Sequence, residues 1–128
     1  MVDKFKLGRY AIGFQGLYYL LTGIWALISI DSFNYVVGHA HEGLPFEMHS
    51  IAAMSVVLGL YFIYSVREQN WYKSNKNIIY LVIGIALSVV LVELVYLPKM
   101  GWNLFWLDLI EEIIIIILLL LVVKNKKW

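Results

Sequence analysis

The chain has 128 residues, of which 62% are hydrophobic and 15% are charged, and its formal net charge is +1. A mean hydropathy of +0.78 is far above that of an ordinary soluble domain and predicts a membrane protein. The absence of cysteine excludes disulfides, thiolate metal sites and thiol nucleophiles. The basic residues are few and flank apolar runs, a pattern that gives no support to nucleic-acid binding.

Four apolar runs are each long enough to cross a hydrocarbon core about 30 Å thick, which takes about 20 helical residues. They cover residues 10–30, 48–66, 78–97 and 103–123. We therefore expect an all-α fold in which residues 1–128 form a single integral membrane domain. Its architecture would be a four-transmembrane-helix bundle with a long outer loop between the first two helices.

The distribution of basic residues predicts the orientation in the membrane. Lys and Arg are concentrated before residue 10, between residues 67 and 76, and after residue 123. By the positive-inside rule, both termini and the loop between the second and third helices are cytoplasmic. The loop of residues 31–47 contains no Lys or Arg and faces outward. Because it is long and rich in apolar residues, we expect it to fold onto the outer end of the bundle.

Small and polar residues inside the runs indicate how the helices pack. Gly16 in the first run, Gly59 in the second and Gly84 in the third predict places where neighbouring backbones approach closely. Gln15 and Thr22 are expected to form hydrogen bonds between helices.

The concentrated chemistry lies between Glu93 and Glu112. Ionisable groups at membrane depth cost about 2.5–3.5 kcal/mol each on insertion scales, so they indicate a functional site by default. On a helix, Asp108, Glu111 and Glu112 share about a third of the circumference and can converge. The pocket that we predict, for a ligand or for protons, is formed by Glu93, Tyr96, Asp108, Glu111, Glu112 and His49.

Lys99 is the only basic residue close to these acids in the sequence. Carboxylates with so little positive charge nearby must hold protons, accept hydrogen bonds or bind a cation. A metal site is one solution, because zinc, iron and manganese accept imidazole and carboxylate ligands. Its candidate ligands outside the acidic cluster are His39, His41, Glu47 and His49.

Three classes of function stay open. The first is a small accessory subunit, or a component that binds lipid, quinone or another small ligand. The second is a membrane enzyme that uses buried carboxylates, or a metal held by His and carboxylates, on a lipid-like substrate. The third is an ion or proton transporter, which is disfavoured because the inner half offers few polar groups. The expected partners are membrane lipid and a larger membrane protein complex or a second copy of the chain, and no particular cofactor is indicated.

Several short motifs are spread over most of the chain. They are Thr22-Gly23-Ile24-Trp25, Ser32-Phe33, Val37-Gly38, Glu93 with Tyr96, and Trp106-Leu107-Asp108 followed by Glu111 or Glu112. Together they resemble a family of uncharacterised small bacterial four-helix membrane proteins that is loosely DoxX-like. The resemblance implies the four-helix fold, the bacterial inner (cytoplasmic) membrane and a role for Glu93 and Asp108, but no established activity. This chain has His39-Ala40-His41-Glu42 where the family pattern has a turn like proline-lysine-aspartate.

Overall fold

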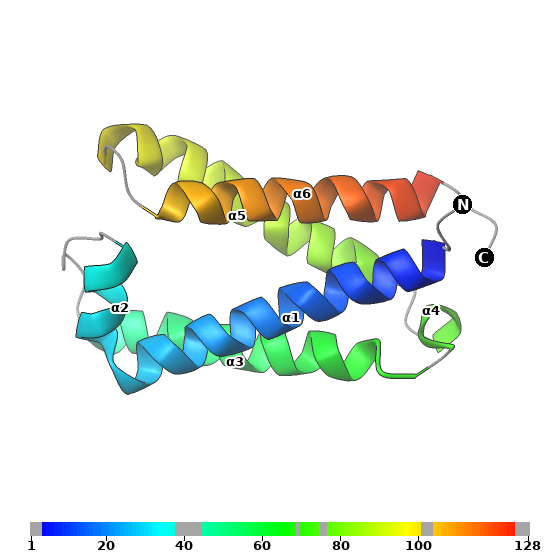
Figure 1. The fold of residues 1–128 in the computed structure, drawn as a ribbon, viewed down its shortest axis with the longest axis horizontal. Coiled ribbons are helices and arrows are strands. Elements are labelled where there is room, and N and C mark those ends of the chain that lie inside the picture. Colours follow the sequence, from blue (N-terminus) through cyan, green and yellow to red (C-terminus); the bar gives the residue numbers. More distant parts are fainter. Residues whose placement is uncertain (1–3, 38–44, 69, 75–76, 101–103, 125–128) are drawn as a thin grey trace.

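The computed structural model describes residues 4–37, 45–68, 70–74, 77–100 and 104–124. These residues form helices and turns, and no strand occurs among them, so the predicted all-α class is confirmed. The helices are α1 (Lys4–Ile28), α2 (Ile30–Val37), α3 (Pro45–Ser65), α4 (Trp71–Ser74), α5 (Asn77–Met100) and α6 (Phe105–Lys124). The long helices are α1, α3, α5 and α6. Figure 1 shows them arranged as a bundle, with both ends of the chain at one end of it and α2 at the other.

Three of the long helices are long and apolar enough to cross a membrane. They cover Phe5–Ile28 of α1, Met48–Ser65 of α3 and Asn77–Lys99 of α5. α6 has 20 residues but carries Asp108, Glu111 and Glu112, and it is not one of the three. These three helices indicate a membrane protein, whereas the fourth predicted span stays a prediction.

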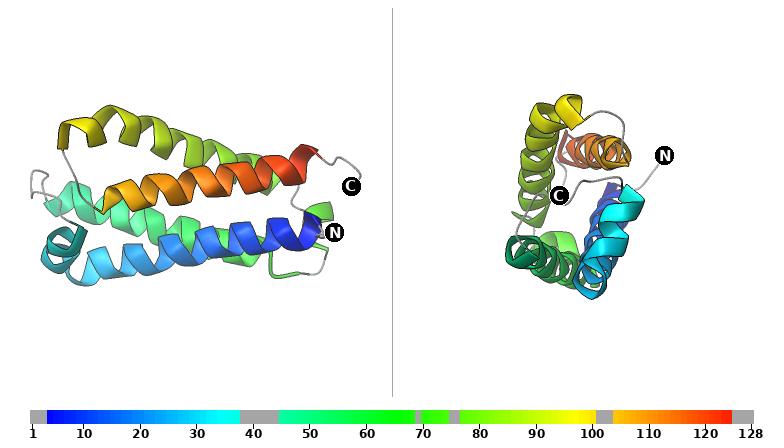
Figure 2. Two further views of the ribbon diagram at one scale, coloured as in Figure 1. Left: turned by 45° about the horizontal axis from the view of Figure 1, so that its top comes forward. Right: turned by 90° about the vertical axis from the view of Figure 1, so that its left-hand side faces the viewer.

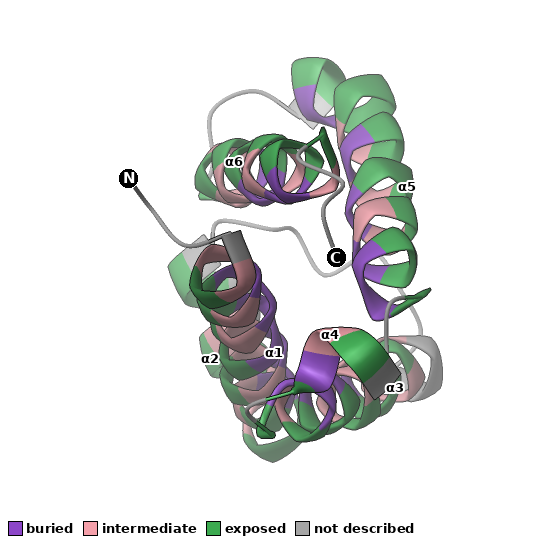
Figure 3. Ribbon diagram, turned by 90° about the vertical axis from the view of Figure 1, so that its right-hand side faces the viewer, coloured by how far each residue is buried: buried purple, intermediate pink, exposed green. Residues whose placement is uncertain are grey.

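The four long helices form two closely packed pairs. α1 packs against α3 and α5 packs against α6, and the pairs meet mainly where α1 contacts α6. The views in Figure 2 show that the pairs diverge toward the end that carries α2. The buried stripes of the helices face one another across the interior, and the outer faces are exposed (Figure 3). An apolar exposed surface of this kind is expected where helices contact lipid.

Backbone contact between α1 and α3 depends on glycine. A Cβ atom built on Gly59 would lie 2.5 Å from the carbonyl oxygen of Gly16, and one on Gly16 would lie 2.8 Å from that of Gly59. A Cβ on Gly23 would lie 2.8 Å from the carbonyl oxygen of Ala52. The close approach that the small residues predict is therefore confirmed at this pair of helices. The prediction of close approach is wrong at Gly84. A Cβ atom there would meet nothing within 4 Å, since no neighbouring helix packs against that face of α5.

The predicted outer loop of residues 31–47 is wrong at both ends, because Ile30–Val37 forms α2 and α3 begins at Pro45. α2 follows a short break at Ser29, and Asp31 in its first turn suits the positive end of the helix dipole. The indole of Trp25 donates a hydrogen bond to Ser32 Oγ at 3.2 Å and meets the Phe33 ring edge-on at 5.2 Å between centroids. These contacts hold α2 against the end of α1. Residues 38–44 lie outside the described part of the chain.

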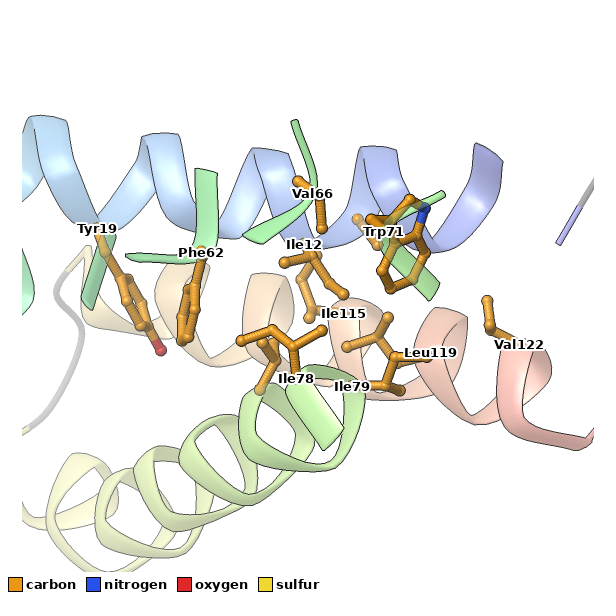
Figure 4. Close-up of a cluster of buried hydrophobic side chains, with 12 residues drawn as sticks. Ile12, Tyr19, Phe62, Val66, Trp71, Ile78, Ile79, Ile115, Leu119 and Val122 are labelled. Carbon is orange, nitrogen blue, oxygen red and sulfur yellow. The ribbon is translucent and has the colours of Figure 1, made fainter. Parts of the chain in front are cut away.

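Buried apolar side chains fill the half of the bundle that carries the termini. Figure 4 shows side chains from α1, α5 and α6 meeting there, among them Ile12, Ile79 and Leu119, each of which is 0% exposed. Trp71 of α4 is 1% exposed and donates its indole N–H to the carbonyl oxygen of Phe5 at 3.3 Å. The end of the bundle near the termini is therefore closed by tightly packed apolar groups.

The glycine contact gives a direct test of the packing. Gly59→Ala should lower the free energy of unfolding by about 1–3 kcal/mol, because the added methyl group must push α1 and α3 apart. The thermal unfolding midpoint in mild detergent, followed by circular dichroism, measures this loss. Gly84→Ala is the matched control and should leave the midpoint unchanged or raise it, since alanine favours helix. Equal midpoints for the two variants would contradict the α1–α3 contact.

Candidate functional site: an acidic cavity between the helix pairs

A cavity of about 1000 Å³ lies in the half of the bundle that carries α2. α1, α3, α5 and α6 all contribute to its wall, and Phe33 of α2 lies against it. Since α3 and α5 have little contact with each other, the space between the diverging helix pairs is not filled. Most of the wall is apolar, and its apolar members include Ile51, Met54, Leu58, Ile85, Val89, Val92, Leu104 and Leu107.

The polar groups of the cavity come mainly from α1, α5 and α6. They are Tyr18, Tyr19, Thr22, Ser55, Ser88, Glu93, Asp108, Glu111 and Glu112. The structure thus brings together all four carboxyl groups that the sequence places in the pocket. The three on α6 lie on one face because they are spaced by three and four residues.

Glu112 is the most deeply buried of the four acids, with 1% of its surface exposed. The Tyr19 hydroxyl donates a hydrogen bond to its Oε1 at 2.9 Å, and Gln15 Nε2 donates one to its Oε2 at 2.6 Å. Both carboxyl oxygens therefore have partners from α1. Hydrogen bonds to a charged or strongly polar buried acceptor are among the stronger ones. These two hydrogen bonds therefore join α1 to α6.

The other three acids are less well satisfied. Asp108 accepts a hydrogen bond from the Tyr18 hydroxyl, and Glu93 lines the same cavity. Both oxygens of Glu111 and the Oε2 atom of Glu93 are buried without a hydrogen-bond partner among the described residues. A buried acceptor without a partner costs about 1–3 kcal/mol, so these three oxygens are where a proton or a ligand would be stabilised.

Other predicted site residues lie elsewhere. Tyr96 is 58% exposed on α5 and does not line the cavity. His49 is half-buried near the start of α3 and is not among the described lining residues either. His39 and His41 lie outside the described residues, as does the side chain of Glu47.

Sequence reasoning missed Tyr18 and Tyr19 as members of the site. Their signal is present, because Gln15, Tyr18, Tyr19 and Thr22 follow the three-four spacing of one helix face within an apolar run. Gln15 forms the expected hydrogen bond between helices. The expectation for Thr22 is wrong, since its hydroxyl donates to the carbonyl oxygen of Tyr18 in the same helix at 2.7 Å.

Three carboxyl groups are close enough to share a metal ion. Asp108, Glu111 and Glu112 each offer an oxygen, and these atoms all lie within 4.8 Å of one another. Oxygen ligands of this kind suit hard cations such as Ca²⁺, Mg²⁺ or Mn²⁺. The group contains no histidine and differs in this from the predicted metal site, which had imidazole ligands.

Comparison of the chain with protein-family models, curated proteins and solved structures finds no match. The resemblance to DoxX-like proteins therefore stays a prediction. The functional argument depends on the cavity and on the side chains that line it.

The neighbouring acids Glu111 and Glu112 test whether the hydrogen bonds of Glu112 stabilise the fold. Glu112→Leu should lower the free energy of unfolding by about 1–3 kcal/mol, because Gln15 and Tyr19 would lose a buried acceptor. Glu111→Leu should cost nothing, since Glu111 has no hydrogen bond to lose. Thermal unfolding of both variants in the same detergent makes the comparison. If Glu111→Leu were the more destabilised of the two, the assignment of these hydrogen bonds would be wrong.

Proposed function

We propose that the protein is a small membrane component that binds an amphiphilic molecule in the cavity, with the apolar part of the molecule against α3 and α5. Its polar group would lie against the carboxyl groups of α5 and α6. The observation that supports this function is one cavity of about 1000 Å³ with a largely apolar wall and four carboxyl groups gathered in it. Ligand sites typically combine an apolar wall with a few converging polar groups.

In this proposal α6 is a fourth membrane span and both termini are cytoplasmic. α6 packs against both α5 and α1 (Figures 1 and 2), so it would cross the membrane with them. Its exposed side chains toward the outside of the bundle are aliphatic, including Ile110, Ile114 and Ile117, whereas Glu112 points inward. Such a helix can cross lipid because its acids are shielded by the bundle. The cavity would then open in the outer half of a bacterial inner membrane.

Binding is better supported than transport. A transport pathway needs polar groups at successive depths. Below the cavity, the part of the chain that the structure describes has the buried apolar cluster around Phe62, Ile79 and Leu119. A reaction on a bound molecule would be a further step at the same carboxyl groups, so binding is the function that the geometry supports first.

Blocking the cavity tests the proposal. Val89 lines the cavity, and Val89→Trp should fill part of it, whereas Val95→Trp places the same side chain at a position of α5 that lies outside the cavity wall and is 55% exposed. Native mass spectrometry of protein purified in mild detergent should find about one amphiphile per chain in the wild type and in Val95→Trp. Val89→Trp should have lost it. A wild-type protein without any bound amphiphile, or equal occupancy in all three proteins, would refute the proposed function.

A further inference from the structure

Among the residues that the structure describes, the cavity wall carries acidic side chains and no basic ones. Its ionisable wall residues other than tyrosine are Glu93, Asp108, Glu111 and Glu112, and no Lys, Arg or His occurs among the described residues that line it. Uncompensated negative charge in a low-dielectric site is costly. A group of opposite charge would therefore be stabilised there more than a neutral one.

The hydrogen-bond donors of the wall are already engaged. The two tyrosine hydroxyls donate to Asp108 and Glu112. The hydroxyls of Thr22, Ser55 and Ser88 donate to backbone carbonyl oxygens, with Ser55 bonded to the Tyr19 carbonyl at 2.9 Å. The indole of Trp25 donates to Ser32 on α2. With the carboxyl groups ionised, the described side chains of the wall thus have no free N–H or O–H group to offer a ligand.

Acceptors are in surplus in the same place. Glu93 and Glu111 line the cavity, and three of their oxygens, Glu93 Oε2 and both oxygens of Glu111, are buried without a donor among the described residues. A ligand that fits this wall must bring N–H or O–H groups, because a ligand that carries only acceptors would leave these atoms unsatisfied.

We propose that the ligand is a long-chain primary amine in its ammonium form, an inference that rests on the binding function proposed above. An ammonium group supplies positive charge and three N–H donors, and Glu93 and Glu111, which line the cavity, have three oxygens without a donor. The hydrocarbon chain would occupy the apolar wall between α3 and α5. A cavity of about 1000 Å³ has room for such a molecule.

The chemistry of the head group distinguishes this ligand from others with the same chain. A quaternary ammonium has the charge but no donor, and an alcohol has one donor but no charge. A carboxylate has the wrong charge and no donor. Dodecylamine, dodecyltrimethylammonium, dodecanol and dodecanoate therefore form a series that separates the contributions of charge and of hydrogen bonding.

The experiment measures competition of these four compounds with tritiated dodecylamine for the full chain in lipid nanodiscs, with binding to empty nanodiscs subtracted. Dodecylamine should bind at least about tenfold more tightly than dodecyltrimethylammonium or dodecanol, since charge-assisted hydrogen bonds are the stronger ones. Dodecanoate should not compete. Val89→Trp should bind none of the four.

A conservative variant tests the residue that carries most of the unpartnered oxygens. Glu111→Gln removes the charge and replaces one acceptor by a donor while keeping the shape of the side chain. Its affinity for dodecylamine should fall about tenfold, to that of dodecanol, whereas its affinity for dodecanol should not change. Glu68→Gln is the matched control, because Glu68 is exposed outside the cavity, and it should bind as the wild type does.

The outcomes separate this inference from the proposed function. If none of the four compounds binds the wild type above Val89→Trp, the binding function itself is refuted. If dodecanol binds as tightly as dodecylamine, or if Glu111→Gln keeps the preference for the amine, the cavity binds amphiphiles but the amine proposal is overturned. Displacement of dodecylamine by micromolar Ca²⁺ or Mn²⁺ would also overturn it, because the carboxylates would then prefer a metal ion.

Discussion

The hydrogen bonds of Glu112 are the constraint on which the rest of the site depends. A carboxyl group that is 1% exposed must find donors inside the protein, and it finds them in Gln15 and Tyr19. This requirement fixes the rotation and the height of α6 against α1. Once they are fixed, Asp108 lies one turn nearer to α2, opposite Tyr18, and Glu111 lines the cavity beside it.

The acids of one cluster therefore have two different physical roles. A hydrogen-bonded network that positions helices and a polar site that receives a ligand are alternatives when only the sequence is considered. In the structure, Glu112 has both oxygens satisfied and belongs to the first role. Glu111 has neither oxygen satisfied and is available for the second. The difference arises from one step along α6, which turns the side chain by about 100° from the face of α1 toward the cavity.

The helices and the convergence of the acids could be predicted because both follow from local rules. Hydropathy and length locate spans, and a period of 3.6 residues places Asp108, Glu111 and Glu112 on one face. The exposure of Tyr96 and the burial of Tyr19 could not be predicted, since tyrosine suits both a membrane interface and a bundle interior. Which of the two applies depends on helix rotation, and that is decided by tertiary contacts.

One such contact also explains why there is a cavity. Gly16 and Gly59 let α1 and α3 approach until their backbones touch, so this pair occupies little width. Near the termini, the Trp71 and Leu119 side chains fill the space between the two helix pairs. Toward α2 the pairs diverge, and side chains as small as Ser55 and Ser88 line the gap. Close packing of α1 against α3, together with small residues in the wall toward α2, thus leaves unfilled volume beside the acids. In the proposed function, a bound molecule occupies this volume.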